Sequence, residues 1–100
     1  MAKIPKEWHK YFWEVNPNNV DMKEHAFYIL GRVLDYGDEG TIKTAREIYG
    51  DRLIKKMLLS TYSRGLSNRT IKRWQNILKL KPEECTKISS IRSKNPTWNY

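Results

Sequence analysis

The sequence predicts an all-α protein, a compact bundle of four to five short helices with a partial helix-turn-helix-like unit and a C-terminal tail. Apolar residues recur three and four positions apart in several segments, the spacing that places them on one side of a helix. Asp, Ser or Thr stands before these segments and Gly after several of them, as at the ends of natural helices. No segment keeps the strict alternation that is typical of a strand.

The length of 100 residues is enough for one domain. We expect a single helical domain over residues 1–86. From residue 86 the apolar spacing fades into the polar stretch TKISSIRSKNPTWNY. Residues 87–100 are therefore predicted to form a basic, flexible tail, unless Ile88, Ile91 and Trp98 pack back onto the domain.

The N-terminal segment PKEWHKYF has Pro5 at the position that proline favours, the first of a short helix. Helical spacing places Trp8, Tyr11 and Phe12 on one side of this helix. The stretch NPNN then breaks it, because Pro and Asn favour turns.

The segment DMKEHAFYILGRVLDYG predicts the central core helix. Asp21 is a good N-cap, and Glu24 completes a pair that resembles a capping box. Gly37 is expected to end the helix in the left-handed conformation. The apolar residues that fill about half of the helix circumference are Met22, Ala26, Phe27, Ile29, Leu30, Val33, Leu34 and Tyr36.

Two shorter helices follow, in TIKTAREIYG and DRLIKKMLLSTY. Thr41 is the expected cap of the first, Gly50 ends it, and Asp51 begins the second. The residues expected to pack inward are Ile42, Ala45, Ile48 and Tyr49, then Leu53, Ile54, Met57, Leu58 and Tyr62. KPEEC, after Leu80, begins a last turn or short helix.

The net charge of +8 is distributed unevenly. Residues 1–50 hold seven Lys and Arg against eight Asp and Glu, whereas residues 51–100 hold twelve against three. All of the excess positive charge thus lies in the second half. This asymmetry favours a polyanionic partner, either nucleic acid or an acidic protein face, over a role in solubility alone.

The stretch LSNRTIKRWQNIL predicts a helix that Ser67 caps, with an apolar side formed by Ile71, Trp74, Ile77 and Leu78. The opposite side carries cations that neutralise phosphates and an amide that pairs with adenine. The candidate nucleic-acid-binding residues on this side are Arg69, Lys72, Arg73, Asn76 and Lys79. Lys55, Lys56 and Arg64 are supporting candidates before this helix, and the basic tail could lie along a nucleic-acid backbone or bind a partner.

The turn before this helix resembles the second half of a helix-turn-helix motif. Gly65 would allow the sharp turn, Leu66 follows it, and Ile71 and Trp74 would dock the second helix. The first half matches less well, because Ser60 and Arg64 stand where apolar residues are usual.

The sequence predicts neither an enzyme nor a metal site, and it implies no cofactor. His9 and His25 lie on different predicted elements, and neither has a second ligand at metal-binding spacing. Asp35, Asp38 and Glu39 are read as turn and cap residues. The single cysteine and the absence of a long apolar run favour a cytoplasmic protein without a membrane segment.

Four segments together resemble a known family. They are FWEV, ILGRVLDYGD, YGDRLIKKML and LSNRTIKRW, and they cover most of residues 12–85 in order. The family comprises small uncharacterised, all-helical prokaryotic proteins described as a domain of unknown function. Its members resemble the smaller partner encoded beside nucleotidyltransferase-type toxins of the abortive-infection class, which implies an antitoxin-like role.

We therefore expect a non-enzymatic nucleic-acid-binding or antitoxin-like regulator that uses the basic helix 67–79. The expected partners are duplex DNA and a nucleotidyltransferase-type toxin, and a homodimer is one possible state. The alternative is a protein-interaction module that binds an acidic nucleotidyltransferase-type partner without touching DNA. The resemblance matches Trp8, Tyr11, Phe12 and Trp13 to partner binding. Their simpler interpretation is that they cap one end of the core.

Overall fold

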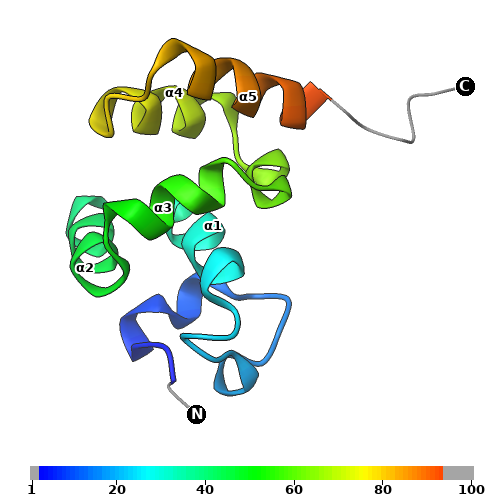
Figure 1. Cartoon of the computed structure of the whole chain (residues 1–100). Helices are drawn as coiled ribbons and strands as arrows, with labels where there is room; N and C mark the ends of the chain where they lie inside the picture. The colour runs from blue at the N-terminus through cyan, green and yellow to red at the C-terminus, as the bar shows by residue number, and fades with distance from the viewer. Residues whose placement is uncertain (1–2, 94–100) are drawn as a thin grey trace, which may run out of the picture.

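The longest apolar stretch of the sequence forms the central helix of the molecule. In the computed structural model, which describes residues 3–93, this is α1 (Ala26–Tyr36). Ile29, Leu30 and Val33 on α1 have no exposed surface. The other elements are arranged around this helix, which lies near the middle of Figure 1.

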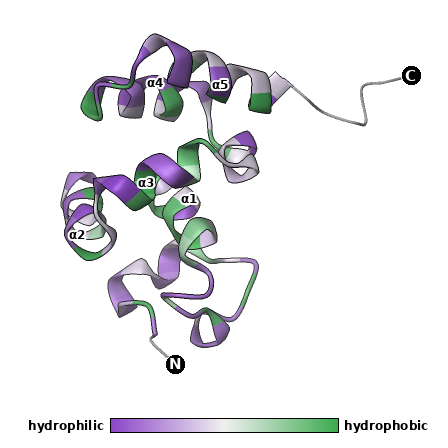
Figure 2. Ribbon diagram, in the orientation of Figure 1, coloured by the Kyte–Doolittle hydropathy of each residue, from purple (hydrophilic) through white to green (hydrophobic). Residues whose placement is uncertain are grey.

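Helices α2 (Glu39–Tyr49) and α3 (Asp51–Leu58) pack against α1 and against each other. Gly50 joins them with a backbone φ of 84°, a left-handed conformation that glycine adopts readily. This residue lets α3 begin directly where α2 ends. Ile54, Met57 and Leu58 on α3 are fully buried and α3 packs on α1, which places the core between these helices, and Figure 2 shows hydrophobic residues on both.

The N-terminal segment closes one end of the core with two 3-10 helices, η1 (Lys6–Tyr11) and η2 (Pro17–Asn19). The buried aromatic residues of this segment are Trp8, Tyr11 and Phe12. The opposite end is formed by η3 (Thr61–Gly65), α4 (Asn68–Ile77) and α5 (Pro82–Ser93). Figure 1 shows α4 and α5 above α3, with the N-terminal segment below α1.

The predicted fold class is confirmed. Residues 3–93 contain five α-helices and three 3-10 helices, and their only β-pairing is an isolated bridge between Lys3 and Asp21. Three helix ends are as predicted: α2 ends at Gly50, α3 begins at Asp51, and Ser67 caps α4.

Three predicted helix ends differ from the structure. The carboxylate of Asp21 accepts hydrogen bonds from the backbone N–H groups of residues 23 and 24. These bonds stabilise a turn that precedes α1, so Asp21 is not the N-cap of that helix, which begins at Ala26. Asp38, not Thr41, caps α2 by accepting a 2.8 Å hydrogen bond from the Thr41 N–H. Gly37 ends α1 with a φ of −74°, so it is not left-handed.

The predicted tail begins too early. α5 continues to Ser93, and Ile88 on it is fully buried. Residues 87–93 therefore belong to the folded domain, which extends the expected boundary at residue 86. Residues 94–100, the rest of the predicted tail, lie outside the described residues.

The helix-turn-helix-like unit is more open than expected. α3 ends at Leu58 and α4 begins at Asn68, and the connection includes η3 instead of the motif's turn of about three to four residues. Gly65 has no left-handed φ, and a Cβ added there would meet no atom within 4 Å. The glycine is therefore not required by a sharp turn. In place of a tight turn the chain forms η3, which Ser60 caps by accepting a hydrogen bond from the Tyr62 N–H.

Candidate nucleic-acid interface

The N-terminus of α4 is fixed to the C-terminal part of α1. Ser67 caps α4 by accepting a 3.2 Å hydrogen bond from the Thr70 N–H. The carboxylate of Asp35 on α1 accepts hydrogen bonds from the Ser67 N–H at 3.2 Å, from the Ser67 hydroxyl at 3.1 Å and from the Thr70 hydroxyl at 2.7 Å. Its negative charge also lies at the helix end where the macrodipole is positive. These contacts fix which side of α4 faces the bundle.

The inward side of α4 is apolar, as its spacing predicted. Trp74 has no exposed surface, and Ile71 and Thr70 are buried beside it. The guanidinium carbon of Arg46 on α2 lies 5.8 Å from the centre of the Trp74 ring, within cation–π range. Packing on this side commits the opposite side of the helix to solvent.

The outward side carries Arg69, Lys72, Arg73 and Asn76, and all four side chains are exposed. The ion pairs within residues 3–93 are Arg32–Glu14, Arg46–Asp51 and Lys55–Glu84. None of them involves a cation of α4. The positive charge of this side is therefore not neutralised by the protein's own acids in the described part of the chain.

One edge of this surface borders a groove of mixed charge between α4 and α2. The groove has a volume of about 580 Å³, and Arg73 and Ile77 form its α4 wall. Glu39 and Glu47 on α2 line the other wall together with Lys43. These carboxylates repel a polyanion. A phosphate backbone would thus approach most favourably over Arg69, Lys72 and Asn76, away from α2. We call these three residues together with Arg73 the α4 basic face.

Two supporting cations differ in their availability. Lys56 on α3 is exposed, as expected. Lys55 forms an ion pair with Glu84 at the start of α5. Its hydrogen bond to this carboxylate, together with that of the Lys81 N–H, lowers the pKa of Glu84 below its ordinary value. Glu84 neutralises Lys55, so this lysine is not free to bind a phosphate, contrary to the prediction.

The arginines near the end of α5 hold the C-terminal helix in place. Arg64 donates from Nε to the backbone oxygen of Ile91 at 2.9 Å. The half-buried Arg92 donates to the backbone oxygen of Ser63 and, at 2.8 Å, to the side-chain oxygen of Asn68. Arg64 thus makes a structural contact while its side chain stays exposed, and its expected role on a binding surface stays a prediction.

Lys79 does not lie on the α4 basic face. α4 ends at Ile77, and Lys79 follows with a φ of 51°, the left-handed conformation in which a helix commonly ends. The Leu80 N–H donates to the Gln75 oxygen across this turn. Lys79 therefore faces the start of α3, where it lines a shallow pocket with Arg52 and Asp51.

Three of the four aromatic residues predicted to bind a partner are buried, and the fourth is exposed. Trp8, Tyr11 and Phe12 are buried in the core, in agreement with the simpler interpretation that they cap it. Trp13 is 62% exposed. Sequence reasoning missed its neighbour Tyr36, which was expected to pack inward and is 54% exposed.

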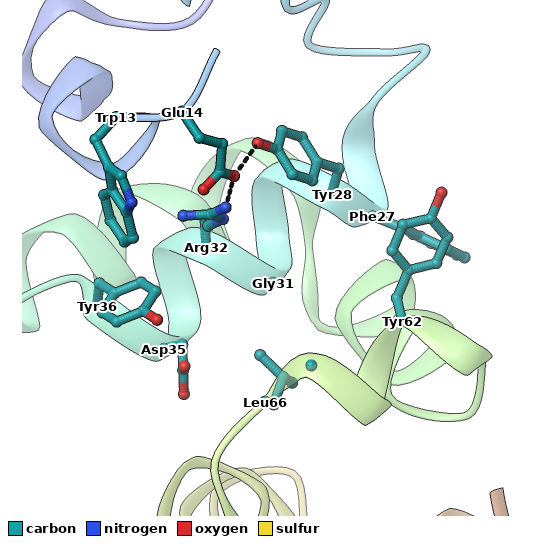
Figure 3. A pocket seen from close by; sticks show the side chains of 11 residues that line it. Trp13, Glu14, Phe27, Tyr28, Gly31, Arg32, Asp35, Tyr36, Tyr62 and Leu66 are labelled. Carbon is teal, nitrogen blue, oxygen red and sulfur yellow. Dashed lines mark hydrogen bonds and ion pairs between the residues drawn. The ribbon is translucent and has the colours of Figure 1, made fainter. Parts of the chain in front are cut away.

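Trp13 and Tyr36 line a groove of about 420 Å³ with Tyr62, which is 52% exposed and was also expected in the core (Figure 3). The one signal in the sequence that could have indicated exposure of these two tyrosines was their position near helix ends. Tyr36 stands in the last turn of α1, and Tyr62 stands beyond the end of α3.

Within residues 3–93, no group of three or more His, Cys, Asp or Glu side chains is placed to hold a metal ion. In the same residues no helix is long and apolar enough to span a bilayer. The carboxylates of Asp35 and Asp38 accept hydrogen bonds at the N-termini of α4 and α2, in agreement with the predicted role as turn and cap residues.

Part of the chain matches a known protein family. Residues 8–58 match DUF6922, which is described as a family of unknown function. The chain belongs to this family. No curated protein matches it, and no solved structure does. In this DUF6922 protein the matched segment extends from η1 to the end of α3, so the α4 basic face lies outside the matched region.

Proposed function

We propose that this DUF6922 protein is a non-enzymatic, antitoxin-like regulator that binds duplex DNA through the α4 basic face. The observation that carries the proposal is that Arg69, Lys72 and Arg73 are exposed on one side of a firmly docked helix and form no ion pair within residues 3–93. Such cations gain free energy on meeting phosphates, because condensed counterions are released from the nucleic acid.

The geometry of α4 suits a groove of duplex DNA. The ten residues of the helix span roughly 15 Å, and the major groove admits an α-helix. Arg69 and Lys72 would hold phosphates, and Asn76, one turn from Lys72, has the amide that pairs with adenine. The antitoxin-like part of the proposal rests on the family resemblance and would add a nucleotidyltransferase-type toxin as the protein partner.

The test is binding to a labelled random duplex, measured by fluorescence anisotropy over a series of salt concentrations. Affinity should fall steeply with salt, and the Arg69→Ala/Lys72→Ala variant should weaken binding and lower the slope of log K against log salt by about two. The matched control is Lys6→Ala/Lys23→Ala, which removes the same charge from exposed positions at the other end of the molecule. Equal effects of the two pairs would refute a localised interface.

The competing function is a protein-interaction module whose basic face binds an acidic protein surface. It predicts negligible affinity for DNA at every salt concentration and co-purification with a nucleotidyltransferase-type partner. In that case Arg69→Ala/Lys72→Ala would release the partner, whereas Lys6→Ala/Lys23→Ala would not.

A further inference from the structure

The groove beside α1 has exposed aromatic walls that come from three separate elements. Trp13 precedes η2, Tyr36 ends α1 and Tyr62 lies in η3, and each is more than half exposed. Single exposed apolar side chains are common, but several gathered around one concave surface indicate a binding surface. Figure 3 shows Trp13 and Tyr36 on one side of the groove and Tyr62 on the other.

The walls are held in place before anything binds. The Arg32 guanidinium lies 4.5 Å from the centre of the Trp13 ring, and Arg32 forms an ion pair with Glu14. Tyr28 donates a 2.9 Å hydrogen bond to the same carboxylate. Trp13 and Tyr36 meet edge to face with ring centres 5.1 Å apart. An occupant would therefore bind to a preorganised surface, which lowers the entropy cost of binding.

The groove is unsuited to a nucleic acid. The charged side chains that line it are Glu14, Arg32 and Asp35, so acids outnumber the one cation, and that cation is already paired. The occupant must instead supply aromatic or apolar side chains, without the dense negative charge of a phosphate backbone.

A segment of this chain has that chemistry and begins close to the groove. Residues 94–100 read KNPTWNY, with a lysine, two aromatic residues and no acid. In an extended chain Trp98 and Tyr100 point to the same side, and Pro96 favours an extended conformation for the residue before it.

The contacts at the end of α5 place the start of this segment near the groove. The last turn of α5 is joined to η3 by the bonds from Arg64 to Ile91 and from Arg92 to Ser63. Ser63 and Arg64 stand between Tyr62 and Gly65, which both line the groove. Seven extended residues span up to about 23–25 Å, a length comparable with the molecule's shortest dimension of 21 Å.

We propose that residues 94–100 dock into this groove of the same chain, with Trp98 and Tyr100 against Trp13, Tyr36 and Tyr62. This docking would cover the exposed aromatic walls. It would also keep the C-terminal segment away from the α4 basic face, and it does not depend on whether that face binds DNA.

The first experiment uses ¹H–¹⁵N NMR on the full chain and compares Trp98→Ala/Tyr100→Ala with Asn99→Ala. The double variant should shift the indole N–H signal of Trp13 and the amide signals of Gly31 and Gly65, which all belong to groove residues. Asn99→Ala should leave them in place. Changes confined to residues 91–93, or equal changes in both variants, would overturn the proposal.

The second experiment narrows the groove from its own side. An added Cβ at Gly65 meets no atom within 4 Å and the backbone there is not left-handed, so alanine fits without strain and the longer leucine side chain would extend into the groove. Gly65→Leu should move the Trp98 indole signal to the position of a solvent-exposed tryptophan, whereas Gly65→Ala should largely preserve it. A Trp98 signal that is the same in wild type and Gly65→Leu would overturn docking at this groove.

A dilution series of the wild-type chain separates same-chain docking from exchange between two copies. The groove signals should not change with protein concentration if the segment docks within its own chain. Signals that move toward those of the double variant on dilution would overturn same-chain docking in favour of a second copy.

Discussion

Thr70 donates a 2.7 Å hydrogen bond to Asp35, and this contact joins the end of α1 to the first turn of α4. The same carboxylate oxygen also accepts from the backbone and the hydroxyl of Ser67. One acid on the core helix thus sets the orientation of the helix that carries the basic face. The face depends on this contact although Asp35 is not part of it.

Asp35→Asn should therefore destabilise the protein by about 1–2 kcal/mol, because charge-assisted hydrogen bonds and a favourable helix-dipole interaction are lost together. Urea denaturation followed by circular dichroism measures this change. Glu47→Gln is the matched control, since it removes one exposed acid without a hydrogen bond or ion pair within residues 3–93. A midpoint equal to that of the control would show that Asp35 does not anchor α4.

Ile88 provides a test of the helix that the sequence failed to predict in full. It is fully buried, so Ile88→Ala should cost about 2–4 kcal/mol through lost burial and a residual cavity. Ser89→Ala, at an exposed position on the same helix, should change stability by less than about 0.5 kcal/mol. Similar denaturation midpoints for the two variants would contradict the packing of α5 on the core.

Some elements whose signals are local were predictable, although Asp21, Thr41 and Gly37 do not act at the helix ends as expected. Ser67, Gly50 and Asp51 act through their own backbone neighbours, and the structure places each of them as expected. The α4 side chains were also separated correctly into buried and exposed sets, because the spacing of an amphipathic helix fixes which residues share a side.

Features that depend on distant partners were not predictable. The pairing of Lys55 with Glu84 and of Arg64 with Ile91 joins residues far apart in the chain, and no spacing rule indicates it. α5 has few apolar residues and no regular apolar side, so these contacts at its two ends support the helix together with the buried Ile88. The burial of the aromatic residues was equally hard to predict. Trp8 is buried and Trp13 is exposed, and this difference depends on how the N-terminal segment packs against other elements.

Tyr49 makes stability depend on alkaline pH. Its hydroxyl donates a 2.8 Å hydrogen bond to the backbone oxygen of Met22, and burial, with the charge of Asp21, raises its pKa to about 12. Above the ordinary pKa of about 10 the unfolded chain loses this proton while the folded chain keeps it. The contribution of Tyr49 to the free energy of unfolding should therefore be constant below about pH 10 and fall as pH rises from 10 to 12.

The measurement is urea denaturation at about pH 8 and about pH 11. Tyr49→Phe loses the hydrogen bond at both pH values, but it should lose less further stability than the wild type between them. The exposed Tyr36→Phe is the control and should keep the wild-type dependence on pH. If Tyr49→Phe and Tyr36→Phe respond to pH alike, ionisation of Tyr49 is not linked to folding.

The ion pair between Lys55 and Glu84 gives the sharpest test of electrostatic binding, because two neighbouring acids provide a matched comparison. Glu84→Gln and Glu83→Gln each raise the net charge by one in the first turn of α5, but only Glu84 neutralises a lysine. If DNA lies over α4 and reaches α3, Glu84→Gln should free Lys55 for a phosphate, raise affinity at low salt and steepen the salt slope by about one. Glu83→Gln should change the affinity less and leave the slope nearly unchanged, because it frees no side chain. Equal gains from both substitutions would mean that only overall charge matters, and a gain from neither would place the nucleic acid away from α3.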